Sequence, residues 1–137
     1  MRELNILIID DHYPDINLLR VLIEEYEPDW QILEAQSVGE GLRYFFPEEH
    51  DPPRPWPDLV LLDIVMKGVD GNGALQFFRQ ETLTRDLPII ALSGHYFPDI
   101  GEQALANGAN LFLPKHFKGE ILDFQKDLLS AIYQLII

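Results

Sequence analysis

The sequence contains no cysteine, few basic residues and no long hydrophobic run. None of its 137 residues is a cysteine, which excludes disulfide bonds, thiolate zinc sites and cysteine nucleophiles. Lysine and arginine together number 10 against 23 aspartates and glutamates, so the formal net charge is −13. Nucleic acids and anionic membranes are bound by basic surfaces, and we therefore expect neither of them as a partner.

The hydrophobic stretches of the chain are all short. None approaches the roughly 18 consecutive apolar residues that a membrane-spanning helix needs, and the run before Asp10 is too short for a secretory signal. We therefore expect a cytoplasmic protein. Apolar residues nevertheless make up 47% of the chain, which disfavours intrinsic disorder. At this length they predict a single domain over residues 1–137.

Five short apolar runs recur along the chain, and such runs predict strands that are buried on both faces of a parallel sheet. They are residues 4–9, 32–35, 59–62, 89–92 and 111–113. Apolar stripes at helical spacing lie between and after them, at residues 16–26, 42–46, 75–78, 104–105 and 121–135. The alternation of strand and helix predicts an α/β, doubly wound domain. Right-handed crossovers would place two helices on one face of the sheet and three on the other.

Local signals mark the ends of the predicted elements. Ser37 and Glu40 have the spacing of a capping box at the start of the second helix. Gly108 stands where the fourth helix should end. Residues 47–57 hold five of the ten prolines and three acidic residues, which predicts an irregular surface loop between the second helix and the third strand.

Polar residues follow four of the predicted strands. Asp10 and Asp11 end the first, Asp63 the third, Ser93 the fourth and Lys115 the fifth. Ligands of open parallel sheets bind at the carboxyl ends of the strands, where the strand order reverses. If the order is 2-1-3-4-5, the first and third strands are neighbours and the three aspartates converge on one small volume.

Three carboxylates in one place repel each other, and a hard divalent cation is the natural way to relieve that repulsion. Magnesium fits best, because it binds through few carboxylates and retains several water molecules. One carboxylate could then act as a nucleophile toward phosphorus and form an aspartyl phosphate. The metal, the ammonium and the hydroxyl would spread the charge of the phosphoryl oxygens.

Over almost its whole length the sequence resembles the receiver domain of two-component response regulators. The matching motifs are Ile8-Ile9-Asp10-Asp11, Leu61-Leu62-Asp63-Ile64-Val65-Met66 followed by Asp70-Gly71, Ala91-Leu92-Ser93-Gly94, and Leu113-Pro114-Lys115. The segment Ala104-Leu105-Ala106-Asn107-Gly108-Ala109 also resembles the end of the family's fourth helix. Each motif is weak alone, but together, in order and at strand ends, they are specific. The resemblance implies a flavodoxin-like fold with a five-stranded parallel sheet of order 2-1-3-4-5.

The resemblance also implies roles for the acidic residues. Asp63 would be the phosphoacceptor. Asp11 would bind Mg²⁺ directly and Asp10 mostly through water, with Asp63 and the backbone carbonyl of Val65 as further ligands. The domain would be a signalling module with at most slow autodephosphorylation, rather than an enzyme.

Three further residues receive roles by the same resemblance. Ser93 would hydrogen-bond the phosphoryl group, and Lys115 would pair with one of its oxygens. Phe112 matches the aromatic switch residue. The phosphoryl group would come from a histidine kinase or a histidine phosphotransfer protein. The signal would pass to a downstream protein, or to self-association, through the face formed by the fourth helix, the strand 111–113 and the helix 121–135.

The sequence departs from the family pattern at two prolines. Lys67 and His116 stand where proline is usual. Because a cis bond before a residue other than proline costs about 2.5–4 kcal/mol, we expect a trans bond between Lys115 and His116. Val65, two residues after the acceptor, is apolar and cannot orient an attacking water, which predicts a moderately long-lived phosphoryl group. His95 could orient a water in part.

Other functions fit the sequence less well. A Mg²⁺-dependent phosphohydrolase with an aspartyl nucleophile would have an aspartate where Val65 stands. A receiver-like interaction module that works without phosphorylation would usually have lost an acidic residue or the lysine. The glycines after the third strand do not form a nucleotide-binding motif. The four histidines are scattered without the spacing of metal ligands. They are His12, His50, His95 and His116.

Overall fold

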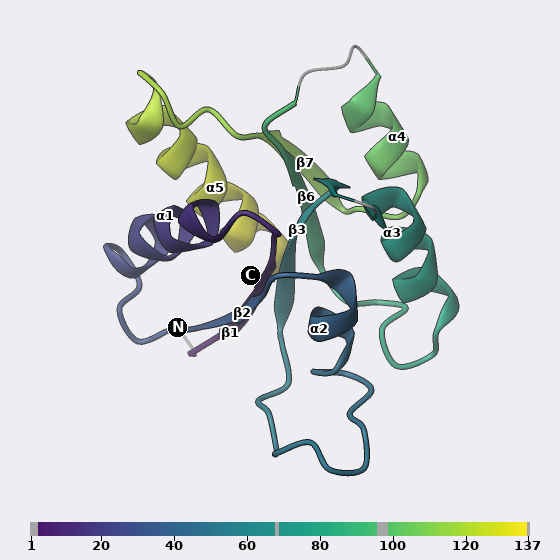
Figure 1. Cartoon of the computed structure of the whole chain (residues 1–137). Helices are drawn as coiled ribbons and strands as arrows, with labels where there is room; N and C mark the ends of the chain where they lie inside the picture. The colour runs from purple at the N-terminus through teal and green to yellow at the C-terminus, as the bar shows by residue number, and fades with distance from the viewer. Residues whose placement is uncertain (1–2, 68, 96–98, 137) are drawn as a thin grey trace.

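The computed structural model describes residues 3–67, 69–95 and 99–136. Five strands form one parallel sheet in the order β2-β1-β3-β6-β7, which runs through the middle of the molecule (Figure 1). Counted along the chain within this sheet, the order is the predicted 2-1-3-4-5. The strands are β1 (Asn5–Ile9), β2 (Gln31–Ala35), β3 (Leu59–Asp63), β6 (Ile89–Ser93) and β7 (Leu111–Pro114).

The described helices cover both faces of this sheet, two on one side and three on the other, as the crossover rule predicts. The first group is α1 (Tyr13–Glu24) and α5 (Ile121–Ile136), which pack side by side. The second group is α2 (Val38–Leu42), α3 (Gly71–Gln80) and α4 (Ile100–Ala106) (Figure 1). None of the described helices is long and apolar enough to cross a membrane.

The central strands β1, β3 and β6 hold the domain together because side chains on both of their faces are buried. The edge strands β2 and β7 are only partly buried, so the prediction of two-sided burial was wrong for them. In β1, Leu7 and Ile9 belong to the core under α2, α3 and α4, whereas Ile6 and Ile8 belong to the core under α1 and α5. Each fully buried aliphatic side chain of this size contributes about 1.5–3 kcal/mol. The continuous apolar runs of the central strands are thus the two-sided interior of a parallel sheet.

A small hairpin follows β3 and is absent from the sequence prediction. It consists of β4 (Val65–Met66) and β5 (Val69–Asp70), paired antiparallel. Gly71 closes it by donating its backbone N–H to the carbonyl of Ile64 at 3.1 Å. A Cβ atom on Gly71 would lie 2.2 Å from the Cα of Ile64, so only glycine allows this close approach. The hairpin fixes the course of the chain just after Asp63.

Two predicted helices are shorter than their apolar stripes. Helix α1 ends at Glu24, and Tyr26 lies beyond it with its side chain exposed. Helix α2 ends at Leu42, and Phe45 lies in the following turns, where it is still buried against Phe78 and Trp56. Apolar spacing therefore predicted the burial of Phe45 correctly but extended the helix too far.

The predicted caps of α2 and α4 are present. Ser37 Oγ accepts a hydrogen bond from the N–H of Glu40 at 3.0 Å. The Glu40 carboxylate accepts from the N–H of Gln36, one residue earlier than an ideal capping box requires. Gly108 follows the end of α4 with a φ of +120°, a conformation that favours glycine. Within α4, Ala104 is buried and Leu105 is exposed.

The loop 47–57 is irregular, as predicted, but it is tied down by charge and by aromatic contacts. Asp51 accepts hydrogen bonds from the guanidinium of Arg43 and forms an ion pair with Arg54 at 3.2 Å. The guanidinium of Arg54 lies over the ring of Tyr44, 5.6 Å from its centroid. Trp56 packs edge-on against Phe45, and the loop is thereby anchored to the segment after α2.

Arg79 connects α3 to two loops that the sequence analysis treated separately. Its guanidinium donates hydrogen bonds to the carbonyls of Leu87 and Gly108, both at 2.8 Å, and to the side chain of Asn110 at 2.9 Å. Burial lowers the pKa of Arg79 below its ordinary value. The residue holds the turn before β6 and the turn before β7 against the end of α3.

Candidate functional site

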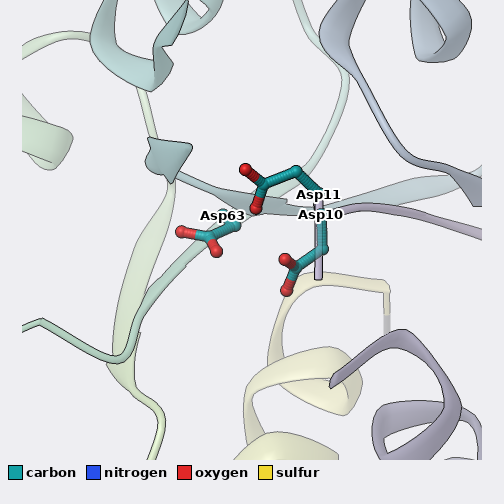
Figure 2. Close-up of side chains that lie close together, drawn as sticks. All are labelled: Asp10, Asp11 and Asp63. Atoms are coloured by element: carbon teal, nitrogen blue, oxygen red, sulfur yellow. The ribbon is translucent and has the colours of Figure 1, made fainter. Parts of the chain in front are cut away.

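The three predicted aspartates meet at the carboxyl edge of the sheet (Figure 2). Strands β1 and β3 are parallel neighbours with Ile9 opposite Leu62. Asp10, which directly follows β1, and Asp63, the last residue of β3, therefore lie at the same level. One carboxylate oxygen from each of Asp10, Asp11 and Asp63 lies within 4.8 Å of the others. The sequence prediction of a convergent acidic cluster is therefore confirmed in its geometry.

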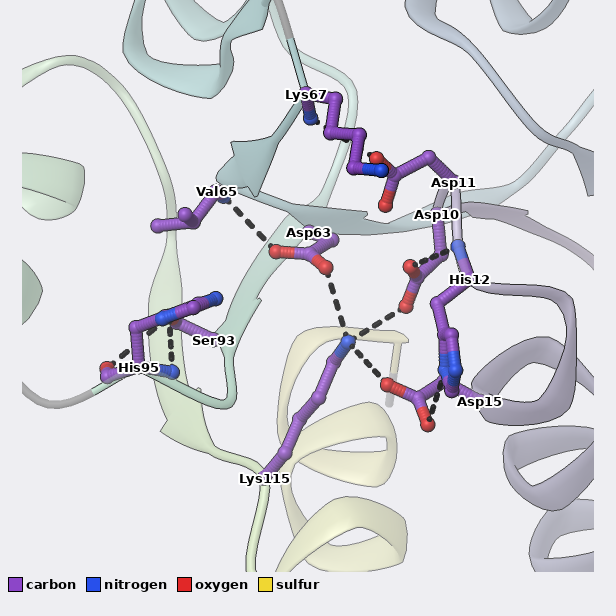
Figure 3. A network of polar contacts seen from close by, with 10 residues as sticks. All are labelled: Asp10, Asp11, His12, Asp15, Asp63, Val65, Lys67, Ser93, His95 and Lys115. Carbon is purple, nitrogen blue, oxygen red and sulfur yellow. Dashed lines mark hydrogen bonds and ion pairs between the residues drawn. The ribbon is translucent and has the colours of Figure 1, made fainter.

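Backbone N–H groups orient all three carboxylates. His12 donates to Asp10 Oδ1, Val65 to Asp63 Oδ1 and Lys67 to Asp11 Oδ2, each at 2.9 Å (Figure 3). The hairpin after β3 supplies two of these donors.

Burial differs sharply within the cluster. Asp10 and Asp63 are 1% and 6% exposed, whereas Asp11 lies open to solvent. Oxygen donors on a partly open edge fit a hard divalent cation that keeps some of its water molecules.

Lys115 is the cation of the site. Its side chain is 3% exposed, and its ammonium donates to Asp10 Oδ2 at 2.6 Å, to Asp15 Oδ2 at 2.9 Å and to Asp63 Oδ2 at 3.0 Å (Figure 3). Its backbone N–H donates to the carbonyl of Ser93 at 2.8 Å. The expected approach of Lys115 to the aspartates is confirmed, although 52 residues separate it from Asp63 in the chain.

The burial of these charges shifts their protonation equilibria. Burial raises the pKa of Asp10 from 3.8 to about 6, even though the hydrogen bond from Lys115 lowers it. Burial alone would lower the pKa of Lys115, but the attraction of Asp63 and the hydrogen bond to Asp10 outweigh it, so this pKa is raised. The raised pKa keeps Lys115 protonated near neutral pH, among carboxylates that repel each other.

Ser93 ends β6 at the same edge and is buried. Its hydroxyl accepts a hydrogen bond from the N–H of His95 at 3.0 Å and lies 3.2 Å from the carbonyl of the same residue. The strand register sets Ser93 opposite Pro114, directly before Lys115. In this conformation the hydroxyl is engaged with the chain that follows β6.

Phe112 lies in β7 and is half-buried against the core under α4. Its ring is so close to Gly101 that a Cβ on that glycine would lie 2.9 Å from the ring. The ring thus contacts the α4 backbone directly. The bond between Lys115 and His116 is trans, because no described peptide bond is cis, which confirms the expectation from sequence.

Sequence reasoning missed Asp15, the third carboxylate on Lys115. Asp15 stands in the first turn of α1, and its other oxygen lies 3.0 Å from Nδ1 of His12. The signal in the sequence was only an acidic residue near a helix start, which is common because the helix dipole favours it. Its contact with Lys115 depends on the direction in which α1 leaves the sheet.

Comparison with known proteins identifies the family. The sequence model of the response regulator receiver domain family matches residues 6–124 of this chain. The chain belongs to the response regulator receiver family. This confirms the resemblance drawn from the strand-end motifs, and it makes the chain a member of a family of signalling domains in two-component systems.

Curated receiver-containing proteins are related to this chain over part of their length. The phosphate regulon regulatory protein PhoB of Escherichia coli is 26% identical over 112 residues, which cover 82% of this chain and 45% of PhoB. The receiver chain thus spans about half the length of such relatives.

Solved receiver structures confirm the flavodoxin-like fold. The phosphorylated cyanobacterial phytochrome response regulator RcpA superposes with a TM-score of 0.82 at 18% identity, covering 94% of this chain and 93% of RcpA. The Mn²⁺-bound form of response regulator Rcp1 gives a TM-score of 0.81 at 17% identity, covering 93% of this chain and 92% of Rcp1.

Proposed function

We propose that this receiver domain, residues 1–137, accepts a phosphoryl group on Asp63 from a phosphohistidine of a histidine kinase or phosphotransfer protein. The observation that carries the proposal is the arrangement around Asp63. Its carboxylate lies next to two further aspartates and to a buried ammonium at 3.0 Å. This combination of nucleophile, cation-binding carboxylates and fixed positive charge suits phosphoryl transfer.

The transfer is a substitution at phosphorus. A carboxylate oxygen of Asp63 forms a bond to phosphorus while the bond between phosphorus and the histidine nitrogen breaks. The bonding electron pair stays with that nitrogen, and the imidazole leaves as it takes up a proton. Val65 N–H donates to Asp63 Oδ1, and Asp63 Oδ2 accepts from the buried ammonium of Lys115, so both oxygens of the proposed nucleophile are held in place.

Asp10, Asp11 and Asp63, together with the backbone carbonyl of Val65, would hold Mg²⁺. The carboxylate cluster fits this hard cation, and the Mn²⁺-bound Rcp1 shows a divalent metal on a similar fold. When bound, the cation neutralises charge on the phosphoryl oxygens. Asp11, which is exposed, would contact the ion directly, and the buried Asp10 mostly through water.

Ser93 and Lys115 would bind the oxygens of the transferred group. The Ser93 hydroxyl has to leave His95, to which it is bonded at 3.0 Å, in order to reach a phosphoryl oxygen. That movement would vacate space toward which the Phe112 ring can turn, away from α4. The surface formed by α4, β7 and α5 would then change for a downstream protein or for a second copy, in the cytoplasm.

The proposal is tested by incubating the protein with Mg²⁺ and acetyl phosphate and following its mass. We expect the wild type and the surface control Asp29→Asn to gain one phosphoryl group, and Asp63→Asn to gain none. Equal phosphorylation of Asp63→Asn would overturn the assignment of the acceptor. Absence of phosphorylation in the wild type would favour an interaction module that works without phosphorylation.

A further inference from the structure

The ammonium of Lys115 has no hydrogen-bond donor to spare. An ammonium carries three N–H donors, and three carboxylates accept from this one, at 2.6 Å, 2.9 Å and 3.0 Å. The side chain is almost completely buried, so water is a poor substitute for any of them. A phosphoryl oxygen can therefore gain a hydrogen bond from Lys115 only if the ammonium gives up or weakens a bond to a carboxylate.

Asp15 is the carboxylate that stands apart from the others. Asp10 and Asp63 belong to the acidic cluster, whereas Asp15 does not. Figure 3 shows Asp15 and Asp63 on different sides of the ammonium, and Asp15 belongs to the first turn of α1. Asp15 is 23% exposed and is steadied by Nδ1 of His12 at 3.0 Å. It therefore pulls the ammonium toward α1 and away from the acceptor.

Phosphorylation of Asp63 moves the negative charge that the Lys115 ammonium has to neutralise. In the transition state negative charge is spread over the phosphoryl oxygens, which lie beyond the Asp63 carboxylate. The ammonium has to follow that charge, and each contact that holds it toward α1 opposes the movement. The Asp15 carboxylate also adds a negative charge near an incoming anion, which raises the energy of that anion.

We propose that Asp15 is a positioning residue that restrains Lys115 and slows the phosphorylation of Asp63. The restraint rests on the proposed function, because it acts on the phosphoryl transfer to Asp63. This role differs from that of the proposed metal-binding carboxylates, because Asp15 acts through the lysine alone. The contact between Asp15 and Lys115 would thus keep the rate of Asp63 phosphorylation below the rate expected in its absence.

The test compares Asp15→Asn, Asp15→Glu and the surface control Asp29→Asn with the wild type. The rate of phosphorylation by acetyl phosphate is measured by mass at a Mg²⁺ concentration that saturates each variant. Because partly exposed ion pairs contribute up to about 1 kcal/mol, we expect Asp15→Asn to react about two- to six-fold faster. Asp15→Glu, which keeps the charge, and Asp29→Asn, which removes a distant one, should react at nearly the wild-type rate.

A second measurement follows the lysine itself. In ¹H–¹⁵N spectra of lysine-labelled protein, the buried Lys115 ammonium should give a signal protected from exchange in the wild type, assigned by its loss in Lys115→Met. We expect this signal to weaken or shift in Asp15→Asn and to persist in Asp29→Asn.

The outcomes separate the two proposals. A rate for Asp15→Asn equal to or below that of Asp29→Asn would overturn the restraint and leave the phosphoacceptor intact. A wild-type protein that accepts no phosphoryl group would overturn the proposed function instead. Comparable unfolding midpoints among the variants would show that the rate change does not come from a damaged fold.

Discussion

The carboxylate of Asp11 is exposed, whereas those of Asp10 and Asp63 are buried. Its removal should therefore cost little folding stability and act mainly on the cation. We predict that Asp11→Asn raises the Mg²⁺ dissociation constant by at least about tenfold and slows phosphorylation of Asp63 in parallel. Isothermal titration with Mg²⁺ measures the affinity, with Asp29→Asn as the charge-matched control. An unchanged affinity would exclude Asp11 as a ligand.

Single residues of the site were predictable where a strand ends just before them. Asp10, Asp63 and Lys115 each follow an apolar run, so the parallel sheet alone brings them to one edge. The direction of a side chain was not predictable. Whether Asp15 reaches Lys115, and whether the Ser93 hydroxyl faces His95, depends on the path of the connecting segments. These segments have no regular spacing of apolar residues from which their path could be predicted.

At the scale of elements, β7 and α4 are linked through one tight contact. Gly101→Ala should raise helix propensity by about 1 kcal/mol, but its new Cβ would press on the ring of Phe112 at 2.9 Å. Overpacking of this kind costs about 1–3 kcal/mol. We predict a net loss of stability in the wild-type background and a gain in Phe112→Ala, where the ring is absent. Urea denaturation of the four proteins measures this coupling.

If Gly101→Ala had the same effect in both backgrounds, the contact between Phe112 and α4 would be energetically unimportant. The proposed movement of Phe112 away from α4 would then lose its physical basis, because leaving that contact would change nothing in the helix.

The loop 47–57 depends on the charge of one carboxylate. The hydrogen bond from Arg43 holds the pKa of Asp51 well below its ordinary value of 3.8. A carboxyl group whose pKa is lower in the folded protein stabilises the fold above its unfolded pKa and loses this effect as the pH falls. We predict that the wild type is more stable than Asp51→Asn near neutral pH and that the difference shrinks below about pH 4.

Urea denaturation at a series of pH values tests this prediction, with Asp29→Asn as the surface control. A difference between wild type and Asp51→Asn that stays constant with pH would mean that Asp51 acts by packing rather than by its charge.

Elements with a clear apolar period were predicted, and those without one were not. All five strands of the main sheet appear within a residue of their predicted ends. The central strands β1, β3 and β6 are buried on both faces, which leaves a nearly continuous apolar run, and the edge strands β2 and β7 have shorter apolar runs and are only partly buried. Each strand of the hairpin after Asp63 has only two residues, too few to show a period. The stripe at residues 42–46 continued beyond the end of α2 because turns can bury phenylalanine as well as a helix can.

For the whole molecule, we expect the acidic edge to make folding stability depend on divalent cations. Three carboxylates share a small volume and the chain carries a net charge of −13, so ions that bind the folded site alone will stabilise it. We predict that Mg²⁺ at one hundred times its dissociation constant raises the free energy of unfolding by about 2.7 kcal/mol. Asp11→Asn should need more Mg²⁺ for the same gain.

Denaturation in Mg²⁺ is compared with denaturation in sodium chloride of equal ionic strength. Equal stabilisation by both salts would show that screening of the net charge, and not a specific site, is responsible.

The ammonium of Lys115 and the carboxylate of Asp10 meet across 105 residues of chain. During synthesis the aspartates leave the ribosome long before the lysine does, because β7 is the last strand of the sheet in chain order. If Asp63 accepts the phosphoryl group as proposed, a nascent or partly unfolded chain has this carboxylate without the ammonium that contacts it in the folded domain. Reactivity toward phosphodonors would then be a property of the finished sheet, and we expect an incomplete copy to compete poorly for the donor.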